Sequence, residues 1–255
     1  MQKLLLLLIT MIIGLFMSIT GLKGQNSKVT ENLETKTMTL PHFEKINSAM
    51  VFDVEVRKSN EEKAEISSNF MRFLEIKVSN NTLEIDYKRN QQMENVKTKI
   101  IVYAKDVKAV SAEIGSVVKI KDNFNIQKFS TESGGKIFGD SDAKNITINT
   151  ESGGAFLGTI NTENLTLNAE SGSSIDIQGK IETAKINSEG ASKIIANKTN
   201  ISVATVNAES ASSVTLSISK ELTASASSMA KIRYKTLAGI KFSARRDSGG
   251  TIDSI

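Results

Sequence analysis

The sequence predicts an all-β protein: a parallel β-helix, or β-solenoid, with coils of about 19 residues and an N-terminal β-rich cap. Three observations predict this fold. Glutamates recur every 19 or 20 residues through the C-terminal half, small residues typical of a tight turn follow each of them, and apolar and polar residues alternate between these turns. A period of two is typical of a strand, and a short fixed repeat is typical of a solenoid.

Residues 1–24 form the first element, a predicted signal peptide. A lysine precedes an apolar run from Leu4 to Met17, and small and polar residues follow the run. A positive start, a short apolar stretch and a small-residue exit are typical of an export signal. The run is shorter than the roughly 20 residues that span a membrane. We therefore expect cleavage after Gly21 or Gly24, and no membrane span in the mature chain.

Residues 25–35 are polar and are predicted to be flexible. Residues 36–110 are predicted to form the N-terminal β-rich cap or the first coils, because alternating runs indicate strands at 50–56, 74–78, 83–87 and 98–103 without the 19-residue period. Asn80-Asn81, between two of these runs, predicts a hairpin turn. A cap is expected because the open end of a solenoid exposes sheet edges that recruit other chains. Residues 36–255 are expected to form one continuous domain.

Residues 111–255 are predicted to form the repetitive β-helix. The residues three before and five after each repeating glutamate are apolar, and the residue two before it is Ser or Asn. We expect the apolar columns to fill the interior and the Asn column to form a ladder of amide hydrogen bonds between coils about 4.8 Å apart. Two looser repeats follow, the first with Met229 in the apolar column and the second running from Asp247 to Ile252. The repeating glutamates are Glu113, Glu132, Glu151, Glu170, Glu189 and Glu209.

The composition excludes several classes of function. Because the chain has no Cys, it forms no disulfide, thiolate metal site, Cys nucleophile or lipidated cysteine. Its single histidine, His42, excludes a multi-His metal site and is expected to be a surface or packing residue. The net charge is +4, and Lys3 and Lys23 account for two of these charges, so the rest of the chain carries +2. With no Trp and so small a charge, the chain is not expected to bind nucleic acid.

The column of glutamates is the candidate binding site. Glu132, Glu151, Glu170, Glu189 and Glu209 are expected to lie in line at successive corners, where carboxylates about 5 Å apart repel by roughly 0.8 kcal/mol in water. One interpretation is that these side chains point into solvent beside a tight turn. A second is a site for a hard cation such as Ca²⁺, held by carboxylates and Ser hydroxyls. A third is a ligand-binding face. No other cofactor is expected.

Two further features have alternative interpretations. Asp140 and Asp142 follow Gly139 as the only close carboxylate pair at the end of a coil. Paired carboxylates hydrolyse glycosides, but Asp at the corners of a turn explains the same pattern. The run of residues 231–246 holds six Lys and Arg residues and no acid. It is either a basic patch for anionic surface polymers or a solvated cap that prevents stacking on another molecule.

The chain resembles a known family. It carries Phe43-Glu44-Lys45-Ile46, then Val51-Phe52-Asp53-Val54-Glu55-Val56, the strand around Leu83-Glu84-Ile85, and repeated Glu-Ser-Gly-Gly coils. These motifs resemble the auto-transporter adhesin, head GIN domain family of Bacteroidota-type bacteria, over about residues 40–250. The resemblance implies a cell-envelope or secreted right-handed β-helix with no established catalytic residues, so no functional residue is carried over.

Three hypotheses about function follow from the sequence. The first is an exported, non-catalytic envelope protein, an adhesin that binds a surface glycan, polymer or protein. The second is a polysaccharide-processing enzyme that uses Asp140 and Asp142. The third is a structural envelope module that associates with itself through a coil end. Under each hypothesis, the protein is expected to be located in the periplasm, on the outer surface or in the medium.

Overall fold

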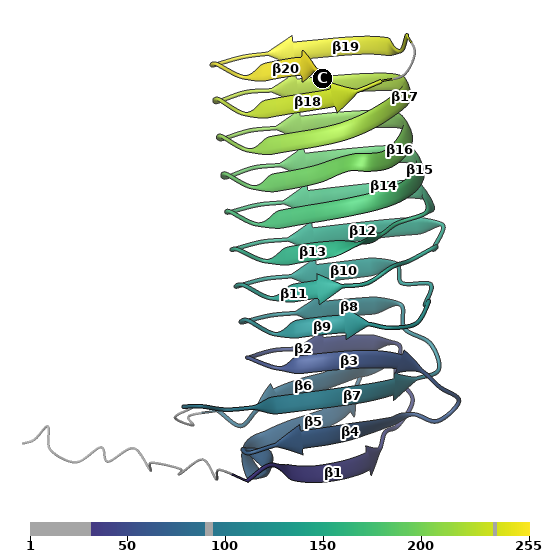
Figure 1. The fold of residues 1–255 in the computed structure, drawn as a ribbon, viewed down its shortest axis with the longest axis vertical. Helices are drawn as coiled ribbons and strands as arrows, with labels where there is room; N and C mark the ends of the chain where they lie inside the picture. Colours follow the sequence, from purple (N-terminus) through teal and green to yellow (C-terminus); the bar gives the residue numbers. More distant parts are fainter. Residues whose placement is uncertain (1–31, 90–93, 237–238) are drawn as a thin grey trace, which may run out of the picture.

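The structure is a computed structural model that describes residues 32–89, 94–236 and 239–255. The predicted signal peptide, residues 1–24, and residues 25–31 of the predicted flexible segment lie outside the described residues. The described chain builds a tall column of stacked coils above a broader base (Figure 1). The column has about eight turns with coils of about 19 residues, which confirms the predicted fold class.

Twenty strands, all hydrogen-bonded in one continuous sheet, make up the described chain. The strands of the base and the first coils are β1 (Glu34–Thr39), β2 (Lys45–Ser48), β3 (Asp53–Lys58), β4 (Lys63–Ser68), β5 (Leu74–Ser79), β6 (Thr82–Tyr87), β7 (Thr98–Ala104), β8 (Ala109–Ala112) and β9 (Val117–Ile120), with a short 3₁₀ turn η1 (Met71–Phe73). The strands of the upper column are β10 (Lys128–Thr131), β11 (Lys136–Phe138), β12 (Asn145–Thr150), β13 (Ala155–Thr159), β14 (Thr162–Ala169), β15 (Ser174–Ser188), β16 (Lys193–Ala208), β17 (Ser213–Ala226), β18 (Lys231–Lys235), β19 (Lys241–Arg246) and β20 (Thr251–Ser254).

Each coil has one strand on the back of the column and one on the front. In Figure 1, β8, β10, β12 and β14 form the back face, and β9, β11 and β13 form the front face. The longer strands β15, β16 and β17 begin on the front and continue into the back strand of the next coil, as their pairing shows. All pairs above the base are parallel, and their register is constant except for shifts in the β15–β16 and β16–β17 pairs, near Asp176 and Ile201. The back strands run to the left and the front strands to the right as the chain climbs, so the winding is right-handed.

The corner between the back and front strands is a two-residue left-handed turn. At the Glu132 corner, Ser133 and Gly134 have φ values of 50° and 77°, and the same pair of positive values recurs at each later corner. Two successive positive φ values are typical of a type I′ turn, which favours small or glycine residues. Corners also bond to one another, since the Gly134 N–H donates to the Ser152 carbonyl of the next coil at 3.1 Å.

The interior of the column is filled by the predicted apolar columns. The residues three before and five after each glutamate are all buried, which confirms the prediction. The rings of Phe129 and Phe156, from adjacent coils, lie 4.7 Å apart. The placement of Met229 was wrong: it occupies a corner with φ 63° and is 69% exposed, whereas Ile232 is the buried residue in register with Val214.

The base explains why residues 36–110 lack the period. Strands β2 and β3 form the lowest coil and pair in parallel with β8 and β9 of the next coil. Between these two coils the chain makes β4 to β7, of which β6 and β7 pair in parallel with the lower edges of β2 and β3. The β1–β4, β4–β7 and β5–β6 pairs are antiparallel. Asn80 and Asn81 form the predicted hairpin, with φ values of 50° and 61°.

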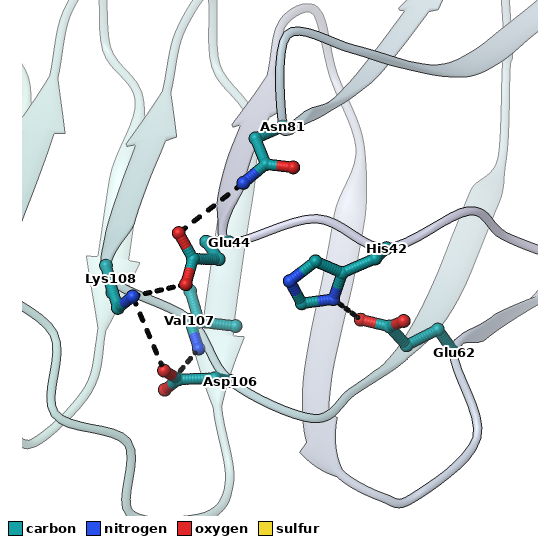
Figure 2. Close-up of polar contacts among 7 residues, drawn as sticks. All are labelled: His42, Glu44, Glu62, Asn81, Asp106, Val107 and Lys108. Atoms are coloured by element: carbon teal, nitrogen blue, oxygen red, sulfur yellow. Dashed lines mark hydrogen bonds and ion pairs between the residues drawn. The ribbon is translucent and has the colours of Figure 1, made fainter.

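A strap of residues 105–108 returns the chain from β7 to β8, and Figure 2 shows how it is fastened. The Lys108 ammonium forms an ion pair with Glu44, just before β2, and lies 4.0 Å from Asp106. Asn81 donates to the other Glu44 oxygen at 3.5 Å. In the same view, His42 contacts the buried Glu62 at 2.9 Å, as expected for a packing residue at the surface.

The Glu44–Lys108 pair predicts a dependence of stability on pH. The hydrogen bond from Lys108 lowers the pKa of Glu44 below its ordinary value of 4.5. The stability that this pair supplies is complete above that ordinary pKa and is lost as the pH falls through the lowered pKa of the folded state. We expect Glu44→Gln to remove part of the fall in melting temperature between about pH 5 and about pH 3.

The control for this test is Glu163→Gln, which removes an exposed carboxylate paired with Lys144 at 3.1 Å on the column. Its melting temperature should fall with acid as that of the unchanged protein does. Identical acid profiles for Glu44→Gln and the unchanged protein would contradict the prediction. Thermal unfolding followed by circular dichroism gives the measurement.

Candidate functional site

An open groove on the front face is the candidate functional site. It has a volume of about 520 Å³ and lies across β9, β11, β13 and the first halves of β15 and β16. One wall is a column of outward side chains that are paired in register: Lys119, Phe138, Leu157 and Asp176. The volume lies within the range of about 300–1,000 Å³ that is usual for ligand sites.

Two glycines give the groove a backbone floor. Gly139 and Gly158 line it at the positions that Ile120 and Ile177 occupy in the coils below and above. A Cβ atom on Gly158 would lie 1.8 Å from the Gly139 carbonyl oxygen, and one on Gly139 would lie 2.7 Å from the Ile120 side chain. The coils therefore approach one another here as only glycine allows.

The wall of the groove exposes two large apolar side chains that touch water. Phe138 is 39% exposed and Leu157 is 49% exposed, and the two are in register on β11 and β13. A contiguous exposed apolar surface is typical of an interaction site. Polar groups surround it: Asp140 accepts the Thr159 N–H at 2.6 Å, and Gln178 donates to the Thr159 hydroxyl at 3.1 Å.

The rim of the groove carries two ammonium groups that no carboxylate neutralises. Within the described residues, Lys121 and Lys198 are exposed and form no ion pair, whereas Lys119 pairs with Asp53 at 3.0 Å. These two lysines stand at opposite ends of the groove, on the coils below and above Phe138 and Leu157. They are available to a ligand without the breaking of an existing pair.

The back face is different because its polar side chains bond to one another. Asn168 donates to Asn149 and Asn187 donates to Asn168, each at 2.8 Å, and Asn164 donates to Asn145 at 2.9 Å. The predicted Asn ladder is therefore confirmed from Asn149 to Asn187. Amides that satisfy one another offer less to a ligand than the rim of the front groove does.

The structure brings the predicted glutamate column together at the corners. The side chains lie exposed in one line, away from the front groove, and none of them forms an ion pair among the described residues. Within the described part of the chain, no group of three His, Asp or Glu side chains is placed to hold a metal ion. The cation-binding and ligand-binding interpretations remain predictions. The five predicted site residues are Glu132, Glu151, Glu170, Glu189 and Glu209.

The two carboxylates considered for catalysis are both engaged by neighbouring coils. Asp142 accepts hydrogen bonds from Asn123 at 2.7 Å and from Asn161 at 2.8 Å, and these bonds lower its pKa. A carboxylate held ionised in this way is a poor general acid. Asp140 accepts the backbone N–H of Thr159, also in the next coil. This geometry is that of a structural ladder at a turn.

Four residues of the groove were not predicted from the sequence as site residues: Phe138, Leu157, Lys121 and Lys198. A signal for the first two exists in the sequence, because they are large apolar residues in a column whose neighbours, Lys119 and Asp176, are charged. The groove itself needs the relative placement of five coils. No helix in the described part of the chain is long and apolar enough to cross a membrane.

Three solved structures share this fold at low sequence identity. A "putative adhesin" from Parabacteroides merdae is 17% identical, with a TM-score of 0.80 over 89% of this chain and 97% of that chain. A "putative lipid binding protein" from Parabacteroides distasonis is 18% identical, with a TM-score of 0.77 over 89% and 98%. A "putative adhesin" from Bacteroides fragilis is 18% identical, with a TM-score of 0.68 over 89% and 99%. Identity this low supports the fold alone.

A comparison with curated proteins found no match. A family model described as "Putative auto-transporter adhesin, head GIN domain" matches residues 42–238. The match covers the base apart from β1, the strap and the coils up to β18, including every residue of the front groove. The chain therefore belongs to the auto-transporter adhesin, head GIN domain family, as its motifs indicated.

Proposed function

We propose that the protein is an exported, non-catalytic, adhesin-like surface protein that binds a glycan in its front groove. The family description supports an adhesin-like surface role, and the predicted signal peptide at residues 1–24 supports export. The observation that carries the ligand assignment is the groove itself, in which exposed Phe138 and Leu157 lie beside unpaired Lys121 and Lys198.

A sugar ring fits this combination of groups. It presents a face of C–H groups, which packs on apolar and aromatic side chains, and a rim of hydroxyls, which exchange hydrogen bonds with carboxylate, amide and ammonium groups. Phe138 and Leu157 supply the first surface, and Asp140, Gln178 and Lys198 supply the second. Because the groove crosses several coils about 4.8 Å apart, it suits an extended chain.

The absence of catalysis is part of the proposal. Asp140, which lines the groove, and Asp142, two residues later, already accept hydrogen bonds from the coil above. The lowered pKa of Asp142 works against the protonated state that a glycosidase acid needs. Binding without cleavage needs no carboxylic acid that donates a proton to the ligand.

Phe138→Ala tests the proposal directly. We expect retention on immobilised glycans to weaken at least about tenfold, because the truncation removes the aromatic stacking surface. The matched control is Phe242→Ala, since Phe242 is also exposed, at 41%, but lies on β19, outside the groove. Glycan-array binding of residues 25–255 gives the measurement. Equal retention of both variants and the unchanged protein would contradict the groove assignment.

The same array, run with calcium and with a chelator, tests the glutamate column separately. Loss of retention in chelator that is reproduced by Glu151→Gln with Glu170→Gln would establish a cation site at the corners. Retention that chelator does not change would leave these glutamates as solvated corner residues.

A further inference from the structure

We infer that the glycan is acidic, and that its negative charges bind a row of cations on the front of β18. This inference rests on the proposed function, because it extends the ligand of the groove along the same face. The row consists of Lys231, Arg233 and Lys235. All three side chains are exposed, while the alternate residue Ile232 is buried. Alternate residues of a strand share a face and lie about 7 Å apart, so the row spans about 14 Å.

The row continues the wall of the groove. Arg233 is in register with Thr215, Thr215 with Ile195, and Ile195 with Asp176 at the upper end of the groove. Three coils of about 4.8 Å separate Asp176 from Arg233, a distance of about 14 Å. Lys193 lies on β16, one coil above Asp176, and is in register with Lys231 through Ser213. A chain bound along the column would pass from the groove directly onto the row.

The cations of the row, like Lys121 and Lys198 of the groove, lack carboxylate partners within the described structure. Lys144, Lys220 and Lys241 each pair with a glutamate at about 3 Å. In the described structure no ion pair involves a residue of the row.

The strands on either side of the row contribute little negative charge. In the strand below, the residues in register with the row are hydroxyl residues: Ser213 and Ser217, which are half-buried, and Thr215, which is buried. The strand above contributes one carboxylate, Asp253, opposite Arg233. Like charges held together in this way favour a polyanion as a partner.

The surroundings of the row favour an acidic polysaccharide among polyanions. A membrane surface would require an apolar face along the cations. Near the row, the large exposed apolar side chains are Met229 and Ile255, one at each end, while Ile232 is buried and the strand below carries hydroxyl residues. Single-stranded nucleic acid would require a series of exposed aromatic rings along its path, and the front groove offers Phe138 alone. A uronic-acid polymer needs one apolar platform and repeated cations, which this face provides.

The experiment compares polygalacturonate with its fully methyl-esterified form, a neutral polymer of the same backbone. The variant is Lys231→Gln/Arg233→Gln/Lys235→Gln. The matched control is Lys36→Gln/Lys128→Gln/Lys185→Gln, which removes the same charge from exposed lysines of β1 and the back face. We expect the unchanged protein to bind the acid at least about tenfold more tightly than the ester at low salt.

The row variant should bind the two polymers equally, and the control variant should keep the preference for the acid. The slope of log affinity against log salt should become shallower by about 2 in the row variant, because fewer counterions are released. Phe138→Ala should weaken binding of both polymers.

Each other outcome overturns a definite part of this scheme. Equal binding of acid and ester that still depends on Phe138 would overturn the inference and leave the proposed function standing. If binding of polygalacturonate depends on the row but not on Phe138, the glycan does not bind in the groove. This result would overturn the proposed function and the inference that one glycan binds both the groove and the row. Binding to duplex DNA or to vesicles with anionic lipid as tight as that to polygalacturonate would overturn the assignment to a polysaccharide. Failure to bind either polymer, or dextran sulfate in their place, would overturn the acidic ligand.

Discussion

Gly158→Ala is expected to lower the free energy of unfolding by about 3 kcal/mol or more. The added Cβ atom would lie 1.8 Å from the Gly139 carbonyl oxygen and 3.2 Å from the Phe156 ring. Neither neighbour is the free end of a flexible side chain, because the first is backbone and the second is a buried ring. The two coils would have to separate, and this would break the hydrogen bonds that close the floor of the groove. Urea denaturation followed by circular dichroism gives the change.

Gly134→Ala is the control, because it separates steric overlap from backbone strain. A Cβ atom on Gly134 meets nothing within 4 Å, but the residue has a φ of +77°. We expect a cost of about 1 kcal/mol, which is the usual penalty for a side chain in the left-handed region. Ala211 already occupies the same corner position with a φ of 60°. If Gly134→Ala destabilises the protein as much as Gly158→Ala, the close approach of the coils is not the cause.

Phe129→Ala is expected to lower the free energy of unfolding by about 3–5 kcal/mol. The ring is fully buried and packs on Phe156 of the next coil at 4.7 Å between centroids. Truncation leaves a cavity that a rigid stack of parallel strands cannot close, because every coil is held in register by those above and below. Chemical denaturation measures the loss in the free energy of unfolding. The substitution should also accelerate hydrogen exchange more in β10 and β12 than in β18, relative to the unchanged protein.

Phe242→Ala is the control for this loss. Phe242 is 41% exposed, and its ring packs on Tyr234 at 5.2 Å near the last coil. We expect it to cost about 1 kcal/mol or less. A loss below 1 kcal/mol for Phe129→Ala would contradict the view that the stacked aromatic pair is central to the column.

The stacking of the coils could be predicted because a solenoid repeats its local environment. Each buried position at Phe129 or Ile137 meets the same position of the next coil, so one column of the sequence reports one column of the interior. The corner could be predicted for the same reason. The sequence did not explain why the last corner position is Gly154 in one coil and Ser173 in the next. In the structure, the Ser173 hydroxyl donates to the Thr150 carbonyl at 2.9 Å, whereas Gly154 has no hydroxyl and the Thr131 hydroxyl beside it has no partner.

The base could not be derived in the same way because its pairing is not local. The predicted strand at 50–56 begins three residues late, at Asp53, since Met50 has a φ of 68° and forms the corner of the lowest coil. That corner has neither the glutamate nor the glycine that occurs at most of the others. Strands β2 and β3 of this coil pair with β8 and β9, which follow only after four further strands. The 19-residue interval therefore does not connect them.

The candidate groove depends on small departures from the repeat. Gly139 and Gly158 interrupt a column between Ile120 and Ile177. Phe138 and Leu157 interrupt a column with charged members. A search for the repeat identifies the residues that fit it and passes over these departures. The ligand site and the most regular part of the sequence are therefore different places on the column.

The insertion of β4 to β7 between the first two coils also affects how the chain folds. Lys45 pairs with Ala109, which is 64 residues away, whereas Lys128 pairs with Thr147, which is 19 residues away. Closing the longer loop costs about 1 kcal/mol more in chain entropy. The repeats can thus form first and propagate upward by short steps, while the lowest coil closes late, when the strap delivers Lys108 to Glu44. Whole coils can be added or lost above the strap without changing that closing step.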